Sequence, residues 1–252
     1  MMQFTEQELL EVKEVLKNDD QYYGEYGSKF LSNSNVDVLL NNPKDFGKPT
    51  EQTKAMLLGR YFHTAMLEPN KTGLYEVLDV ASRNTKLYKE AVEQSSEEML
   101  LLSKEREECM EWVSAMKSNI RFFDDIYEPG NSYEVPGVEK IRGVWWKGKA
   151  DIITDNFIID LKTTSDIQNF PRSAKRYNYD SQCYIYQQIF GKPLVFYVVD
   201  KQTHNLGIFP PTDTFIQGGR EKVMTALDQY EKFWGENPTH DPEHFIIHQE
   251  LI

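Results

Sequence analysis

The chain has 252 residues, enough for one large domain or two small ones, and a formal net charge of −12. That charge argues against a generic nucleic-acid coat, because proteins that bind DNA without sequence preference usually present a basic surface. No run approaches the ~18 apolar residues of a membrane span, the N-terminus lacks a signal-peptide pattern, and Cys109 and Cys183 are the only thiols, so we expect a cytoplasmic protein without an iron–sulfur cluster.

The first half of the chain has the periodicity of helices. Capping residues and proline stops predict a short helix over residues 5–18, a helix within 28–45 that ends near Pro43, and a third helix from Thr50 or Thr53 to Leu67. Opposite charges three and four residues apart predict one long helix from about Lys86 to Phe123.

The second half alternates strands with helices. Strands are predicted at Tyr133–Val138, Val144–Thr154, Phe157–Thr163, Leu194–Asp200 and Leu206–Phe209, and helices at Ser173–Phe190 and Thr214–Trp234. This order predicts an α/β fold with a mixed central β-sheet flanked by helices. No linker divides the chain convincingly, so we expect one domain over residues 1–252, with a mainly helical part (1–128) and a β-β-α-β core with a closing helix (129–252).

Two carboxylates and a lysine lie on the predicted hairpin. Asp155-Asn156 suits a two-residue turn, and the resulting register places Asp151 opposite Asp160. Side chains alternate along a strand, so Lys162 lies on the face of both carboxylates. Like charges opposite each other are destabilising, and a hard divalent cation such as Mg²⁺ removes that penalty. The hairpin therefore predicts a metal-dependent phosphodiesterase site, with a solvated hairpin end as the alternative.

Two further motifs are ambiguous by themselves. Gln182 and Tyr186 are four residues apart and would share one helix face. His63 would share a helix face with Gly59, which could allow close backbone approach, and with Met66. Tyrosines and single histidines at such positions are more often core residues than functional groups.

The order of these segments resembles a known family. Gly-Arg-x-x-His-x-x-x-Leu-Glu-Pro (59–69) precedes Lys-Ala-Asp (149–151), Ile-Asp-Leu-Lys-Thr (159–163) and then Gln-x-x-x-Tyr (182–186). This pattern closely resembles the PD-(D/E)XK nuclease superfamily, and within it the exonuclease VIII (RecE-type) branch, which is related to phage lambda-type exonucleases. The resemblance spans roughly residues 30–200 and implies a restriction-endonuclease-like core.

The resemblance also implies a set of site residues. His63, Asp151, Asp160 and Lys162 fall on the four active-site positions of the branch, and Gln182 and Tyr186 fall on its helix motif. Asp151 and Asp160, with the Leu161 carbonyl, would hold Mg²⁺ or Mn²⁺, and His63 and Glu134 would support that ion or a second one. Lys162 would orient water or neutralise charge on the phosphate. Asp160 stands where several relatives have glutamate.

DNA contacts are expected around this site. Basic residues surround the hairpin, and Ser32 and Ser34 match a Ser-x-Ser segment that helps hold a terminal phosphate in related exonucleases, although helix capping explains them equally well. The expected DNA-binding residues are Ser32, Ser34, Arg60, Lys149, Thr163, Arg172, Lys175 and Arg176.

The resemblance implies a 5′→3′ exonuclease that resects linear duplex DNA to 3′ single-stranded tails for recombination and repair. Such enzymes are usually phage-borne, ring-like homo-oligomers that work at duplex DNA ends with a single-strand annealing protein, in the cytoplasm of a bacterial or phage-infected cell. The chain has no nucleotide-binding P-loop, so we expect no ATP requirement.

Two alternative functions remain open. The chain could be a structure-specific or restriction-like endonuclease of the same superfamily, or a catalytically silent DNA-binding module, although intact Asp151, Asp160 and Lys162 argue against the latter. His240, His244 and His248 recur at four-residue spacing, but Pro242 favours a solvated tail over a metal-binding helix.

Overall fold

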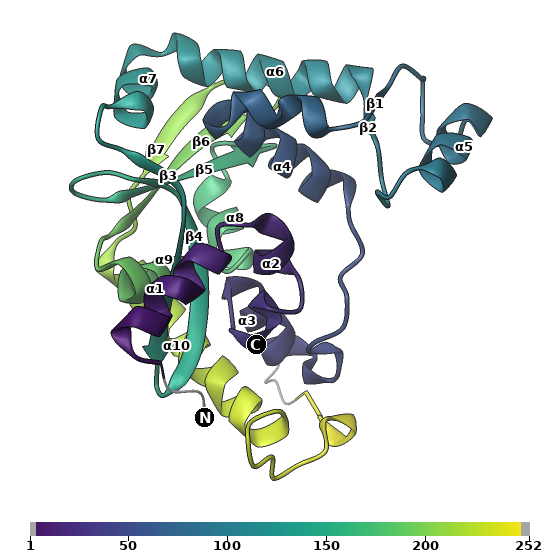
Figure 1. Cartoon of the computed structure of the whole chain (residues 1–252). Coiled ribbons are helices and arrows are strands. Elements are labelled where there is room, and N and C mark those ends of the chain that lie inside the picture. The colour runs from purple at the N-terminus through teal and green to yellow at the C-terminus, as the bar shows by residue number, and fades with distance from the viewer. Residues whose placement is uncertain (1–3, 248–252) are drawn as a thin grey trace.

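The computed structural model describes residues 4–247, and its centre is a five-stranded sheet with the order β3-β4-β5-β6-β7 (Figure 1). β5 and β6 run parallel, and the other neighbouring strands are antiparallel. The mixed sheet predicted from the sequence is confirmed. The strands are β3 (Ser132–Ile141), β4 (Val144–Ile153), β5 (Ile158–Thr164), β6 (Leu194–Asp200) and β7 (Leu206–Phe209).

Helices cover both faces of the sheet, because strands buried on both sides need two apolar layers. One face packs against α4 (Lys54–Leu67), α6 (Ser103–Ser118) and α7 (Ile120–Tyr127). The opposite face packs against α3 (Asn33–Asn41), α8 (Phe170–Arg176), α9 (Tyr179–Phe190) and α10 (Asp213–Phe233). This three-layer arrangement is a restriction-endonuclease-like fold.

The remaining elements lie beside these layers. α1 (Glu6–Val15) and α2 (Asp19–Tyr23) precede the core, and α5 (Lys86–Gln94) stands out to one side of the body (Figure 1). A second, parallel sheet pairs β1 (Val77–Leu78) with β2 (Leu101–Leu102). Short 3-10 helices lie at Gly27–Lys29, Pro43–Asp45, Pro69–Leu74 and Pro242–His244. No helix within residues 4–247 combines the length and the apolar character needed to cross a membrane.

The predicted long helix from Lys86 to Phe123 is wrong. The segment folds as α5, β2, α6 and α7, with Ser95 in an extended conformation at the end of α5. Leu100 and Leu101 turn inward and are buried. Their burial is worth about 1.5–3 kcal/mol each, whereas each helical charge pair contributes only about 0.2–0.5 kcal/mol. The buried leucines therefore decide the local structure.

The predicted helix from Ser173 to Phe190 is also interrupted. Asn178 separates α8 from α9 with a left-handed backbone conformation (φ 57°), which asparagine tolerates better than most residues. The Asn178 carbonyl accepts hydrogen bonds from Asn33 Nδ2 and Ser181 Oγ, and its side-chain Nδ2 donates to Asp37. These contacts between distant segments stabilise the break.

The predicted hairpin register is confirmed at the turn, where Ile153 pairs with Ile158. The β4–β5 ladder ends one pair later, however, before Asp151 and Asp160 become ladder partners. There the Leu161 N–H donates instead to Asp151 Oδ2, at 2.7 Å. The side chain of Asp151 thus replaces a backbone partner, and the two strands part at the carboxylates.

Leu31, in the segment before α3, pairs with a part of the β4 edge that β5 does not pair with. β3 pairs with one edge of β4 at every position except Glu134 and Asp151. Leu31 therefore bonds to the other edge, accepting from the Lys147 N–H and donating to the Trp145 carbonyl. This pairing brings the N-terminus of α3 beside β4.

Candidate metal centre and active site

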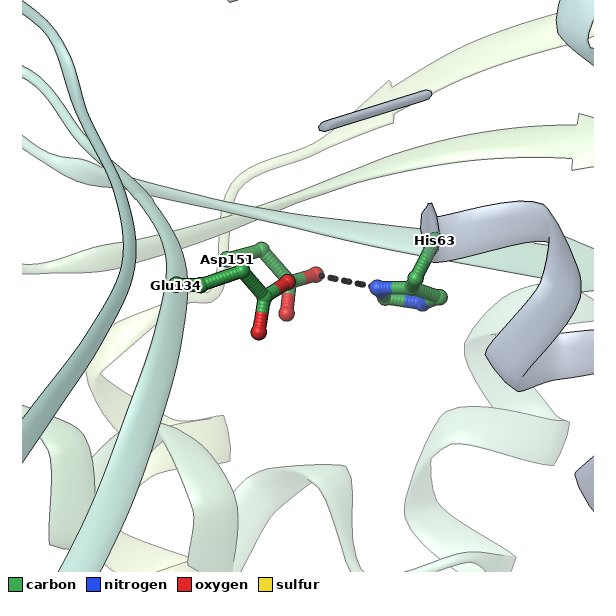
Figure 2. Close-up of side chains that lie close together, drawn as sticks. All are labelled: His63, Glu134 and Asp151. Carbon is green, nitrogen blue, oxygen red and sulfur yellow. Dashed lines mark ion pairs between the residues drawn. The ribbon is translucent and has the colours of Figure 1, made fainter. Parts of the chain in front are cut away.

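Three elements bring His63, Glu134 and Asp151 together (Figure 2). His63 comes from α4, Glu134 from β3 and Asp151 from β4. One ligand atom of each lies within 4.8 Å of the others, and His63 Nδ1 is 3.3 Å from Asp151 Oδ2. Among the described residues, this is the one group of three such side chains that could hold a metal ion.

Glu134 joins this group through a strained backbone. Its φ of 50° lies in the left-handed region, which costs an L-residue about 1–2 kcal/mol. Tyr133 pairs with Ile152 and Val135 with Ala150, but Glu134 and Asp151 are not ladder partners. Such strain persists where the surrounding structure imposes it, and it clusters at functional sites. The Glu134 side chain is half-buried rather than fully exposed to solvent.

Asp160 and Lys162 form a second charged group on β5. Lys162 Nζ is 2.6 Å from Asp160 Oδ2, and Gln182 Nε2 donates to Asp160 Oδ1 at 2.5 Å. Asp160 is 1% exposed, so both of its oxygens need such partners. The Lys162 ammonium also lies 4.9 Å from the ring centre of Tyr179. This group fixes the lysine beside the first cluster.

The two groups share more negative charge than their cations neutralise. Burial opposes the charged form of Asp151, but His63 and Lys162 outweigh it and lower the Asp151 pKa. Burial likewise opposes the His63 imidazolium, but Asp151 raises the His63 pKa. Burial and then the Asp151 charge raise the pKa of Glu134 to about 7. Burial also raises the pKa of Asp160, against the attraction of Lys162.

This donor set suits a hard divalent cation. Two carboxylates and an imidazole nitrogen converge, and carboxylate oxygen is the ligand that Mg²⁺ and Mn²⁺ favour. Three acidic groups face two basic ones. Burial and then repulsion from Asp151 raise the pKa of Glu134, and a bound cation would remove the repulsion. Asp160 lies outside the group of three, and the Leu161 N–H supports Asp151.

The Gln-x-x-x-Tyr motif lies on α9 and contacts both strands of the site. Gln182 bonds to Asp160 on β5, and the Tyr186 hydroxyl donates to the Lys149 carbonyl on β4, at 2.8 Å. Burial raises the pKa of Tyr186 well above its ordinary value, so its hydroxyl stays neutral. The motif therefore positions the two strands that bear the carboxylates. Gly59 does not provide close packing, because a Cβ added there would meet nothing within 4 Å.

The predicted DNA-binding residues divide into two groups. Several are engaged within the protein: Lys149 pairs with Asp19, Arg60 lies 3.9 Å from Glu97, and the hydroxyls of Ser32 and Ser34 are 2.9 Å apart at the start of α3. Thr163 is half-buried on β5. The others stay exposed on α8, namely Arg172, Lys175 and Arg176.

Two side-chain contacts near the site could not be predicted from the sequence. Tyr179, the first residue of α9 after the left-handed Asn178, lies against Lys162. Lys147 is buried against Tyr22, and burial followed by the charge of Lys149 lowers its pKa to about 8. Both contacts depend on the folded chain. No motif spacing could have indicated them.

His240 and His244 lie outside the group of three candidate metal-binding side chains. His240 Nδ1 is 2.9 Å from Thr239 Oγ1, and its ring contacts Phe233. His244 ends a short 3-10 helix, and His248 lies outside the described residues.

The sequence matches one protein family over residues 29–244, the family described as a PDDEXK-like domain of unknown function. The match covers most of the chain. The chain therefore belongs to this family and to the PD-(D/E)XK nuclease superfamily. No curated protein sequence matches it significantly.

The fold is similar to that of a solved structure from Eubacterium rectale, a protein that is provisionally named an exonuclease. It is 19% identical, with a TM-score of 0.64 over 100% of this chain and 97% of its own. At that identity the similarity shows the fold. A phage-related exonuclease from Haemophilus somnus is 16% identical, with a TM-score of 0.36 over 81% of this chain and 94% of its own.

Proposed function

We propose that the chain is a divalent-metal-dependent deoxyribonuclease that hydrolyses phosphodiester bonds. The observation that carries this proposal is the convergence of His63, Glu134 and Asp151 within 4.8 Å, next to the Asp160–Lys162 pair. A purely structural role would not require an excess of buried carboxylates, because uncompensated buried charge is costly.

Asp151, Glu134 and His63 would hold the cation, with Asp160 and the Leu161 carbonyl as further ligands. When bound, Mg²⁺ or Mn²⁺ supplies a Lewis acid that activates water and neutralises phosphate charge. The Leu161 N–H keeps Asp151 oriented toward this site.

Lys162 would act as a permanent positive charge. Although burial opposes protonation, Asp160 raises the pKa of Lys162 above its ordinary value. A lysine that stays protonated cannot serve as a general base at neutral pH. It can donate to a phosphate oxygen and stabilise the charge that develops there. Gln182 and Tyr186 keep Asp160 and β4 in place for this step.

The finer assignment is a 5′→3′ exonuclease that resects linear duplex DNA and leaves 3′ single-stranded tails for recombination by strand annealing. Its motifs resemble the RecE-type branch, and the fold is shared with the Eubacterium rectale protein. Its partners would be DNA ends, a single-strand annealing protein and further copies of itself in a ring, in the cytoplasm of a bacterial or phage-infected cell. A net charge of −12 suits enclosure of DNA by a ring, which needs little long-range attraction.

The test uses purified protein, Mg²⁺ or Mn²⁺, and linear duplexes labelled at the 5′ or the 3′ end, with a covalently closed circle in parallel. We expect mononucleotides from 5′ ends and an intact circle. Lys162→Ala should abolish release, while Lys48→Ala, a change to an exposed lysine paired with Asp45, should not. Nicked circles would assign an endonuclease instead. Absence of cleavage with either metal would refute the nuclease proposal.

A further inference from the structure

An exposed tyrosine stands at the junction between α8 and α9. Tyr177 is 59% exposed, whereas the neighbouring Phe170 and Phe196 are buried in the core. A large aromatic ring left in water at a helix junction contributes little to the core.

Two aromatic contacts connect this ring with the active-site lysine. The Tyr177 and Tyr179 rings have centroids 6.2 Å apart, and Lys162 Nζ lies 4.9 Å from the centre of the Tyr179 ring. Phe170 and Phe196 contact the other parts of Tyr179. The rings thus form a series from Lys162 to solvent, which we call the tyrosine ladder (Tyr179 and Tyr177).

The ladder is held rigidly by the residue between its two members. Asn178 is 8% exposed and left-handed, at φ 57°. Its side chain donates to Asp37 and accepts from Lys222, and its carbonyl accepts from Asn33 Nδ2. The exposure of Tyr177 therefore results from a defined backbone geometry, so its ring is pre-organised.

The surroundings of Tyr177 are basic in a protein of net charge −12. The Arg176 guanidinium lies 5.9 Å from the centre of the Tyr177 ring, and Arg172 and Lys175 are exposed on the same helix. Basic residues at the end of a helix also favour its dipole, but that role does not need an exposed ring. Cations beside an exposed aromatic face are typical of sites that bind single-stranded nucleic acid.

We propose that Tyr177 stacks on an unpaired base of the DNA strand whose backbone lies at Lys162, with the α8 cations on the adjacent phosphates. The ligand class is a single-stranded or frayed segment of DNA. This inference rests on the proposed nuclease function and assigns the strand its path over α8. It makes Tyr177 a positioning residue for the substrate.

The test measures the affinity of the full-length protein for labelled oligothymidine of about 15 nucleotides, by fluorescence anisotropy, in EDTA and in Ca²⁺. A second probe of the same length carries abasic sites in place of the bases. Tyr177→Ala should weaken oligothymidine binding about 5- to 150-fold, because stacking contributes to affinity base by base. The affinity of Tyr177→Ala for the abasic probe should equal that of wild type.

Two sets of variants keep the result specific. Tyr177→Phe and Tyr177→Trp retain an aromatic face and should bind oligothymidine nearly as wild type. Phe123→Ala removes a ring that is 47% exposed on α7 and should change neither affinity.

The outcomes separate this inference from the proposed function. Unchanged oligothymidine binding by Tyr177→Ala, or an equal loss on both probes, would overturn the stacking role while leaving the nuclease proposal intact. Failure of the wild-type protein to bind either probe would also overturn the stacking role, whereas the nuclease proposal is decided by the cleavage assay on duplex DNA.

Discussion

Replacement of Glu134 by glutamine should stabilise the metal-free protein. Burial and the nearby charge of Asp151 raise the Glu134 pKa from 4.5 to about 7. Because the folded-state pKa lies above the unfolded one, ionisation of Glu134 opposes folding. This cost is absent below about pH 4.5 and complete above about pH 7. At about 1.4 kcal/mol per pKa unit the full shift is worth about 3 kcal/mol, and solvent screening of a half-buried group reduces it to about 1–3 kcal/mol.

The assay is thermal unfolding of both proteins in EDTA across pH 5 to 8. At pH 8 the Glu134→Gln variant should melt about 2–12 °C higher than wild type, since 1 kcal/mol shifts Tm by about 2–4 °C in a domain of this size. The difference should shrink toward pH 5. Glu139→Gln, which changes an exposed glutamate on the same strand, should show no comparable gain.

Addition of Mg²⁺ should reduce the difference in Tm by which the Glu134→Gln variant exceeds wild type. A cation held by the carboxylates stabilises the folded state through its binding free energy, so wild type should gain more in Tm than Glu134→Gln. A variant that is no more stable than wild type at pH 8 in EDTA would refute the reasoning. In that case the Glu134 carboxylate of the wild-type protein would not be destabilised by burial and by the charge of Asp151.

Gln182→Leu should lower the single-turnover rate of DNA cleavage about 10- to 100-fold with the fold retained, because Gln182 fixes the buried Asp160 carboxylate; an unchanged rate would contradict this role. Glu105→Gln should destabilise the protein by about 3 kcal/mol at pH 7. Burial opposes ionisation of Glu105, but hydrogen bonds from the Arg83 guanidinium and the Leu102 N–H lower its pKa to about 2. The stabilising contribution of Glu105 is therefore lost as the pH falls from about 4.5 toward 2. A difference in Tm between wild type and Glu105→Gln that stays constant over this pH range would contradict the assignment. Gly219→Ala should destabilise the protein by at least about 2 kcal/mol, because its Cβ would lie 2.0 Å from a backbone oxygen of α9. The matched Gly218→Ala, with the nearest atom at 3.9 Å, should be tolerated in the same denaturant titration.

Much of the fold could be predicted because local rules agree with the tertiary structure. Apolar β-branched runs on both sides of Asp155-Asn156 indicate β4 and β5, and this pair of residues predicts the turn whose register pairs Ile153 with Ile158. Thr53 begins α4, as its capping pattern predicts. The two wrong helices share one cause. Periodicity does not reveal where buried Leu100 or the left-handed Asn178 interrupts a helix, because distant contacts stabilise both breaks.

In the candidate site, too, some features follow from local sequence and others depend on contacts between distant segments. By itself, the sequence determined which residue types can bind a cation or carry charge, and that Asp151, Asp160 and Lys162 would lie on neighbouring strands. Only the tertiary structure decided that His63 and Glu134 meet Asp151, and that Lys162 neutralises Asp160. It also decided that Lys149 is paired with Asp19, across 130 residues of sequence. The physical reason is that charge compensation acts through space: the partner that a buried charge needs comes from whichever segment the packed layers bring within a few ångströms.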